Sequence, residues 1–138
     1  MFVSKSMTKK VITINKGADI FEAKEKMAEH RIRHLPVVTK DCYLIGIVSD
    51  RDVRSAMPLS DYNSKKIKGK IAKLKIKDIM TIDPVALSPL HTIQDALLLI
   101  QKTRVGAFPV VDEKGKLRGI ISVRDLLRAF INVMGMED

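Results

Sequence analysis

Two short segments combine glycine, serine and aspartate in a pattern that suits phosphate and ribose chemistry. They read GIVSDRD (Gly46–Asp52) and GIISVRD (Gly119–Asp125), and each leads from an apolar, strand-like run into the start of a helix. Glycine allows a ligand or a second backbone to approach closely, and the free N–H groups at a helix start attract phosphate. A serine hydroxyl adds a donor, and an aspartate one turn further on can accept both hydroxyls of a ribose. Together these residue types describe half of a nucleotide site.

The same spacing has a simpler explanation. Ser-x-x-Asp ahead of an apolar run is also a capping box, and a duplicated cap would occur twice as well. The segment RIRHLPVV (Arg31–Val38) favours the nucleotide interpretation, because Arg33 and His34 directly precede an apolar strand and guanidinium groups suit phosphate oxygens. A solvated strand entry would explain the same two residues without a ligand. Both interpretations stay open on the residues alone.

An internal repeat positions both segments. Residues 7–57 align without gaps onto 80–130 at a constant offset of 73, with 15 identities in 51 positions. Unrelated sequences of average composition would share about three. The identities include Met7-Thr8 with Met80-Thr81, Pro36-Val37-Val38 with Pro109-Val110-Val111, and the two glycine-serine junctions. The pattern indicates a duplication.

Each copy predicts the same series of elements. In the first copy they are a β run at Val11–Ile14, a helix from Ile20, strands at Leu35–Val38 and Leu44–Val48, and a closing helix from Asp52. In the second copy they are Val85–Leu87, a helix from Ile93, Phe108–Val111, Leu117–Ser122, and a closing helix from Asp125. A unit of about 50 residues buries too little surface to be stable alone, so we expect the copies to share one core. The predicted fold class is α+β (mixed α/β), with repeat 1 at 1–62, a lysine-rich linker at 63–77 and repeat 2 at 78–138.

Composition narrows the class of protein. The 138 residues are 46% hydrophobic, 30% charged and 4% aromatic, which is typical of a soluble globular domain. No apolar run approaches the roughly 18 residues of a membrane-spanning helix, and no signal peptide is recognisable, so we expect a cytoplasmic protein without membrane contact. The single cysteine, Cys42, excludes an intramolecular disulfide and a multi-thiolate metal site.

Catalytic and metal-binding patterns are not recognisable. His30 and His34 are four residues apart, but they straddle an expected helix end and a strand entry, so their rings should diverge and we expect no metal site. Cys42 falls in an expected hairpin loop without an orienting base. We expect no enzyme, since paired carboxylates, a nucleophile elbow and a P-loop are all missing from the sequence.

The net charge of +9 is concentrated in one segment. Seven lysines fall within residues 65–77, and the rest of the chain has 18 basic and 16 acidic residues. These lysines alternate with isoleucine and leucine, which fits either a solvated connection or a surface for an anionic partner. The segment has no aromatic residue to stack on bases, which weighs against single-stranded nucleic acid. A nucleic-acid-binding or scaffold protein that uses this segment is the alternative function.

The repeated motifs together resemble a known family. The Met-Thr opening, the Pro-Val-Val strand and the Gly-x-x-Ser-x-Arg-Asp junction are similar to those of the cystathionine-β-synthase (CBS) domain. From about Met7 to Phe130 the chain resembles a tandem CBS pair, or Bateman module, and EHRIRHLPVV followed by GIVSDRD is most similar to the CBS part of acetoin-utilisation-type proteins. The resemblance implies two β-α-β-β-α repeats packed with pseudo-twofold symmetry, with two equivalent clefts for AMP, ADP, ATP or S-adenosylmethionine.

The resemblance also implies roles for individual residues. Asp52 and Asp125 would each hold a ribose, with Ser49 and Ser122 near phosphate. The first cleft would further comprise Arg33, His34, Arg51, Val85 and Val105, and the second Ile12, Ile32 and Arg124, with the apolar residues against adenine. Gly106-Ala107 stands where the first copy has Arg33-His34, so the first cleft is predicted to prefer more phosphorylated ligands. The implied protein is a non-catalytic, homodimeric regulatory module that senses an adenine nucleotide and signals to an unidentified partner protein.

Overall fold

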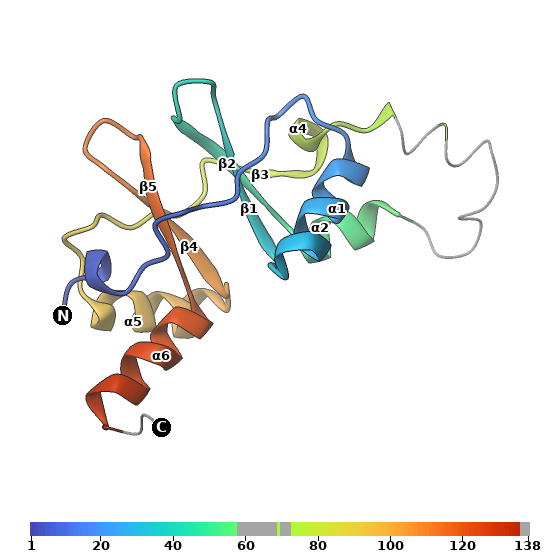
Figure 1. Ribbon diagram of the computed structural model, residues 1–138. Coiled ribbons are helices and arrows are strands. Elements are labelled where there is room, and N and C mark those ends of the chain that lie inside the picture. Colours follow the sequence, from blue (N-terminus) through green and yellow to red (C-terminus); the bar gives the residue numbers. More distant parts are fainter. Residues whose placement is uncertain (58–68, 70–72, 136–138) are drawn as a thin grey trace. The chain divides into compact units, whose positions relative to one another are not determined.

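The structure is a computed structural model that describes residues 1–57, 69 and 73–135 (Figure 1). The chain divides into two compact units, one formed by Ile12–Pro84 and the other by Met1–Val11 together with Val85–Asp138. Each unit combines helices with an antiparallel sheet, which confirms the mixed α/β class. Among the described residues, no helix has the length and apolar character needed to cross a bilayer.

The unit formed by Ile12–Pro84 has a three-stranded sheet in the order β1-β2-β3, antiparallel throughout. Its elements are α1 (Ile20–His30), β1 (His34–Val38), β2 (Leu44–Ser49), α2 (Asp50–Ala56), α4 (Ile76–Ile79) and β3 (Thr81–Ile82). Asp19 fixes the start of α1, because its carboxylate accepts a hydrogen bond from the Glu22 N–H at 2.9 Å. Arg31 ends the helix in the left-handed conformation (φ 54°).

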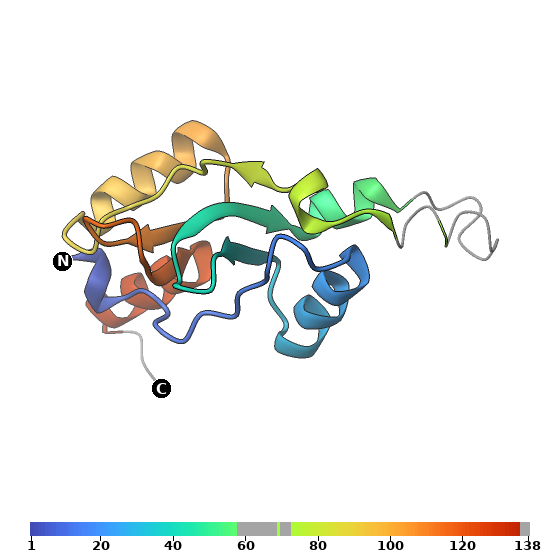
Figure 2. The ribbon, with the colours of Figure 1, turned by 90° about the horizontal axis from the view of Figure 1, so that it is seen from above.

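The second unit has the same plan with a two-stranded sheet of β4 and β5. Its elements are the 3₁₀ turn η1 (Val3–Lys5), α5 (Ile93–Thr103), β4 (Ala107–Val111), β5 (Leu117–Ser122) and α6 (Val123–Val133). The N-terminal segment lies along β5, where Thr8 and Ile120 exchange backbone hydrogen bonds of 2.8 and 3.0 Å. Figure 2 shows the blue η1 turn at the end of the unit that contains β4, β5 and α6.

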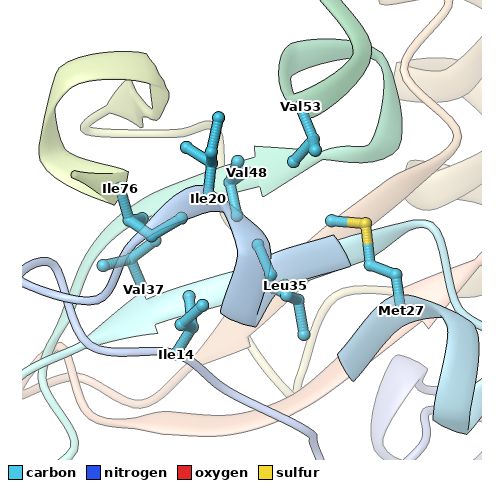
Figure 3. Packing of buried hydrophobic residues seen from close by; sticks show 9 residues of the cluster. Ile14, Ile20, Met27, Leu35, Val37, Val48, Val53 and Ile76 are labelled. Carbon is cyan, nitrogen blue, oxygen red and sulfur yellow. The ribbon is translucent and has the colours of Figure 1, made fainter. Parts of the chain in front are cut away.

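Each unit has its own hydrophobic core. In the unit Ile12–Pro84 the apolar side of α1 packs on β1 and β2, and Figure 3 shows these side chains together with Ile76 of α4. The residues of this cluster are Ile14, Ile20, Ala23, Met27, Leu35, Val37, Val48, Val53 and Ile76. The cluster in the other unit consists of Val3, Leu87, Ala96, Phe108, Val110, Ile121 and Leu126. The single shared core expected from the small size of the repeats is therefore wrong, because two separate clusters form.

The two copies exchange their opening segments, which explains how each unit gains enough core. Val3, which precedes the first copy, is fully buried against the body of the second, and Ile76, which precedes the second copy, is fully buried against the body of the first. The backbone contacts match: Val3 N–H donates to His91 O at 2.7 Å, and Ile76 N–H donates to Ala18 O at 2.8 Å. Sequence repeats and spatial units are thus offset, while the repeat boundaries at 62 and 77 stay a prediction.

The other elements expected from the sequence are present, but their lengths or starting residues differ from the prediction. The β runs that open each copy reduce to single parallel bridges, Ile14 with Val37 and Leu87 with Val110. The closing helices α2 and α6 start two residues before the expected aspartates, because the serines act as N-caps. Most of the lysine-rich linker, residues 63–68 and 70–72, lies outside the described residues.

Candidate functional site

The two Ser-x-x-Asp segments are capping boxes. At the start of α2, Ser49 Oγ accepts a hydrogen bond from Asp52 N–H at 3.1 Å, while Asp52 Oδ2 accepts one from Ser49 N–H at 2.8 Å. At the start of α6 the equivalent bonds between Ser122 and Asp125 measure 3.3 and 2.9 Å. In each aspartate the capping bond uses one carboxylate oxygen, Oδ2, and holds the carboxylate beside the helix N-terminus. The second oxygen, Oδ1, lies outside the capping box in both copies.

Asp125 has a third donor that the sequence analysis missed. Thr8 Oγ1 donates to Asp125 Oδ1 at 3.1 Å, and Ser122 Oγ is 3.1 Å from Oδ2. Arg128 Nη1 lies 3.8 Å from Oδ1. Asp125 is 5% exposed, the one polar or charged residue that is buried among the described residues. The repeated Met-Thr opening was the available signal for Thr8, but only the exchange of opening segments brings Thr8 of the first copy to Asp125 of the second.

The first junction is more open than the second. Asp52 is half-buried. Thr81, which occupies the place of Thr8 in this unit, is exposed on β3, and no hydrogen bond joins it to Asp52 in the described part of the chain. One carboxylate oxygen of Asp52 is therefore freer to accept a bond from a ligand than the corresponding oxygen of Asp125.

The junction glycines are required by a neighbouring backbone. A Cβ placed on Gly119 would lie 2.6 Å from Met7 Sδ and 2.9 Å from the carbonyl oxygen of Thr8. The same substitution at Gly46 would meet Met80 Sδ at 2.6 Å and the Thr81 carbonyl at 2.9 Å. Of the two reasons that the sequence suggests for glycine, the close approach of a second backbone is the one found here.

Arg33 and His34 lie beside the first junction. His34 begins β1 directly opposite Ser49, and the Arg33 carbonyl accepts a hydrogen bond from Asp50 N–H at 2.8 Å. Burial lowers the pKa of His34 below its usual 6.5; Arg33 adds to this effect, whereas Asp52 and Asp50 oppose it. The imidazole is therefore held neutral at neutral pH, beside an exposed guanidinium.

The corresponding position in the other unit has the same backbone hydrogen bonding but no charged side chain. Ala107 lies opposite Ser122, and the Gly106 carbonyl accepts a hydrogen bond from Val123 N–H at 3.0 Å. The two junctions thus share a main-chain framework and differ in the side chains around it.

The remaining predicted residues occupy different environments. Arg51 and Arg124 are exposed at the second positions of α2 and α6. Val85 is 54% exposed and Val105 41%, whereas Ile12 and Ile32 are half-buried at the margin of the first core. Each of these apolar pairs belongs to the unit that does not contain its predicted aspartate, so their assignment to adenine stays a prediction.

The histidines and the cysteine are dispersed. His30 ends α1 and His34 begins β1, while Cys42 is exposed in the β1–β2 hairpin loop with a positive φ of 67°. Within residues 1–57, 69 and 73–135, no group of three histidine, cysteine, aspartate or glutamate residues could hold a metal ion.

Comparison with known proteins identifies both copies. The family model for the CBS domain matches residues 3–59 and 76–132. A CBS domain-containing protein from Dictyostelium discoideum is 34% identical over 136 residues, covering 97% of this chain and 94% of its own length. A homoserine O-acetyltransferase from Methanococcoides burtonii is 38% identical over 126 residues, but the match spans only 23% of that enzyme.

Solved structures share the fold over nearly the whole chain. CBSX2 from Arabidopsis thaliana, crystallised with AMP, has a TM-score of 0.83 at 28% identity and covers 96% of this chain and 98% of its own. A protein attributed to acetoin utilization (AcuB) from Vibrio cholerae has a TM-score of 0.83 at 27% identity, with 99% and 94% coverage. The CBS domain pair of the protein MJ0100, in complex with 5′-methylthioadenosine and S-adenosylmethionine, has a TM-score of 0.79 at 25% identity, with 94% and 99% coverage.

Proposed function

This chain belongs to the CBS domain family, and we propose that it is a regulatory module that binds an adenosyl ligand at its two Ser-x-x-Asp junctions. The observation that carries the proposal is that the carboxylate of each junction aspartate is fixed in position by the capping box. Each aspartate is fixed by a backbone N–H at 2.8–2.9 Å at the first turn of a helix and keeps one oxygen outside the capping box. A carboxylate in that state can accept the hydroxyls of a ribose, and the positive end of the helix favours a nearby phosphate.

Related structures support the ligand class. CBSX2 was crystallised with AMP, and the MJ0100 pair with 5′-methylthioadenosine and S-adenosylmethionine, so adenine and the ribose ring with its two hydroxyls are the part these ligands share. In this chain the proposed roles are ribose binding by Asp52 and Asp125, and phosphate or other polar-tail binding by Ser49 and Ser122. Val85 and Val105, and Ile12 and Ile32, are proposed to flank the base.

The two junctions should differ in ligand preference. Arg33 and His34 add positive or proton-accepting groups at the first junction, where the second has Gly106 and Ala107. We propose that the first junction takes the more phosphorylated ligands, and that Arg51 and Arg124 reach the polar tail at each junction. Occupancy would then regulate a partner protein by favouring one of two states, which requires different affinities for those states.

A binding assay with a matched capping control tests the proposal. Thr92 and Asp95 form the same capping box at the start of α5, with bonds of 2.8 and 3.1 Å, and belong to neither junction. Asp52→Asn and Asp125→Asn should each abolish binding of AMP, ATP or S-adenosylmethionine at one junction, while Asp95→Asn should leave binding unchanged. A ligand at 100 times its Kd stabilises the folded state by about 2.7 kcal/mol, which a thermal-shift measurement detects.

The outcomes of this thermal-shift assay distinguish the two candidate functions. Loss of the ligand-induced shift in one junction variant, with full retention in Asp95→Asn, supports the proposal. No shift with any adenosyl compound contradicts it. Stabilisation by duplex DNA alone, falling steeply as salt rises, favours the alternative in which the lysine-rich segment binds nucleic acid.

We also propose that the module is a homodimer in the cytoplasm. The helices α5 and α6 carry an exposed apolar surface with Leu98 at 63%, Leu127 at 57% and Phe130 at 59% exposure. Exposed apolar patches of this kind mark association surfaces. Light scattering should give twice the chain mass, and Leu127→Glu with Phe130→Glu should give a monomer. A monomeric wild-type protein at micromolar concentration would contradict the proposal.

A further inference from the structure

A basic hollow lies on the unit that contains η1 and β5. It is a shallow hollow, open to solvent, with a volume of about 390 Å³, and it is lined by Ser4, Lys5, Met7, Lys9, Pro89 and Arg118. Three of these six residues are cations, one offers a hydroxyl, and Met7 and Pro89 supply an apolar wall. None of the six belongs to the Ser-x-x-Asp junctions.

Backbone contacts fix the walls of the basic hollow. Ser4 N–H donates to the Pro89 carbonyl at 3.2 Å, which joins η1 to the loop before α5. Met7 lies against Gly119, next to Arg118 on β5. The hollow is therefore assembled from three segments that are far apart in the sequence.

The positive charge in the basic hollow is only partly neutralised. Arg118 Nε bonds Asp112 Oδ2 at 3.0 Å, but no described residue forms an ion pair with Lys5 or Lys9. Both lysines are exposed at the rim. Like charges repel when they are gathered without a counterion, so this grouping favours an anion.

The fold itself does not require these cations. In the other unit Lys77 N–H donates to Lys16 O at 3.0 Å, the same bond that Ser4 makes to Pro89, so the two surfaces correspond residue by residue. There the positions of Lys5, Lys9 and Arg118 are occupied by Asp78, Ile82 and Ile45. The same framework thus forms without cations at these three positions, while Lys77 and Lys16 take the places of Ser4 and Pro89, so the two surfaces carry their positive charges at different positions.

We propose that the basic hollow binds a small organic phosphate, independently of the adenosyl sites. Lys5, Lys9 and Arg118 would surround the phosphate group together with the Ser4 hydroxyl, since ammonium and guanidinium groups are good hydrogen-bond donors to phosphate oxygens. The volume exceeds that of a phosphate ion, and Met7 and Pro89 would contact the organic part. Three residues of β5 lie between Arg118 and Ser122, and the four steps span roughly 13 Å of strand, so the two phosphate positions do not coincide.

Titration of the full-length protein with phenyl phosphate tests this inference. Phenyl phosphate offers one phosphate and one apolar ring; inorganic phosphate and phenol each offer one of the two. In two-dimensional NMR at 150 mM salt, amide shifts should centre on Ser4, Lys5, Lys9 and Arg118, with a Kd lower for phenyl phosphate than for either part. Shifts centred on Ser122 and Asp125, or no saturable shifts, would overturn the proposal.

Charge-matched variants separate a site from general attraction. Lys5→Gln with Lys9→Gln removes two rim charges and should weaken phenyl phosphate binding roughly tenfold. Lys102→Gln with Lys114→Gln makes the same change in net charge on exposed parts of the same unit and should leave the Kd unchanged. Equal weakening in both pairs would mean non-specific attraction and would refute the proposal. Asp125→Asn should retain binding, which keeps this result distinct from failure of the adenosyl sites.

Discussion

Adding one methyl group at Gly119 should release the exchanged N-terminal segment. The new Cβ would lie 2.6 Å from Met7 Sδ, which can swing away, and 2.9 Å from the Thr8 carbonyl, which cannot move without its backbone. That carbonyl accepts from Ile120 N–H at 3.0 Å, and Thr8 N–H donates back to Ile120 O at 2.8 Å. A shift large enough to relieve the clash therefore weakens both hydrogen bonds.

The expected cost follows from these contacts. Overpacking costs about 1–3 kcal/mol, and each weakened hydrogen bond adds up to about 1 kcal/mol, so Gly119→Ala should lose about 2–3 kcal/mol of unfolding free energy. For a chain of this length that lowers Tm by roughly 6–15 °C. Gly46→Ala should behave alike, because Thr81 O lies 2.9 Å from its Cβ position.

Urea unfolding followed by circular dichroism measures these losses. Gly17→Ala is the matched control, since its nearest neighbour is Asn15 Oδ1 at 3.3 Å, and it should change stability by less than about 0.5 kcal/mol. Met7→Ala combined with Gly119→Ala should recover only part of the loss, because the Thr8 carbonyl stays in place. A Gly119→Ala protein as stable as wild type would refute the reasoning.

Three further predictions concern other parts of the structure. Because burial holds the pKa of His34 below 6.5, the unfolded chain binds a proton more readily, so stability should fall as pH drops below 6.5 towards the lowered pKa. His34→Gln should make Tm less dependent on pH between 7.5 and 5.5, and an unchanged dependence would contradict this. Thr8→Val removes the 3.1 Å bond to Asp125 and should cost about 1 kcal/mol in urea unfolding, whereas Thr81→Val should cost almost nothing; equal losses would count against the asymmetry. Ile76→Ala opens a cavity at a fully buried position and should cost about 2–5 kcal/mol, while Ile82→Ala at 67% exposure should be neutral; a small loss at Ile76 would show that the exchanged segment is not part of the core.

The parts of the candidate site that depend on residues close together in the sequence were predictable. Ser49 with Asp52, and Ser122 with Asp125, are three residues apart, so each bond between them depends only on the first turn of a helix. The position of His34 beside Ser49 followed less directly, because it needs the register of β1 against β2. Thr8 was not found, since it lies 117 positions before Asp125 in the sequence.

The sequence by itself determined the repeat, the order of its elements and the capping residues, because period, turn residues and helix starts are local properties. Only the tertiary structure decided that each copy completes its core with the opening segment of the other, as Val3 and Ile76 show. Identical Met-Thr openings fit either body equally well in sequence terms, so the alignment could not choose between them. The choice depends on which buried surface each segment covers, and that is a property of the folded chain.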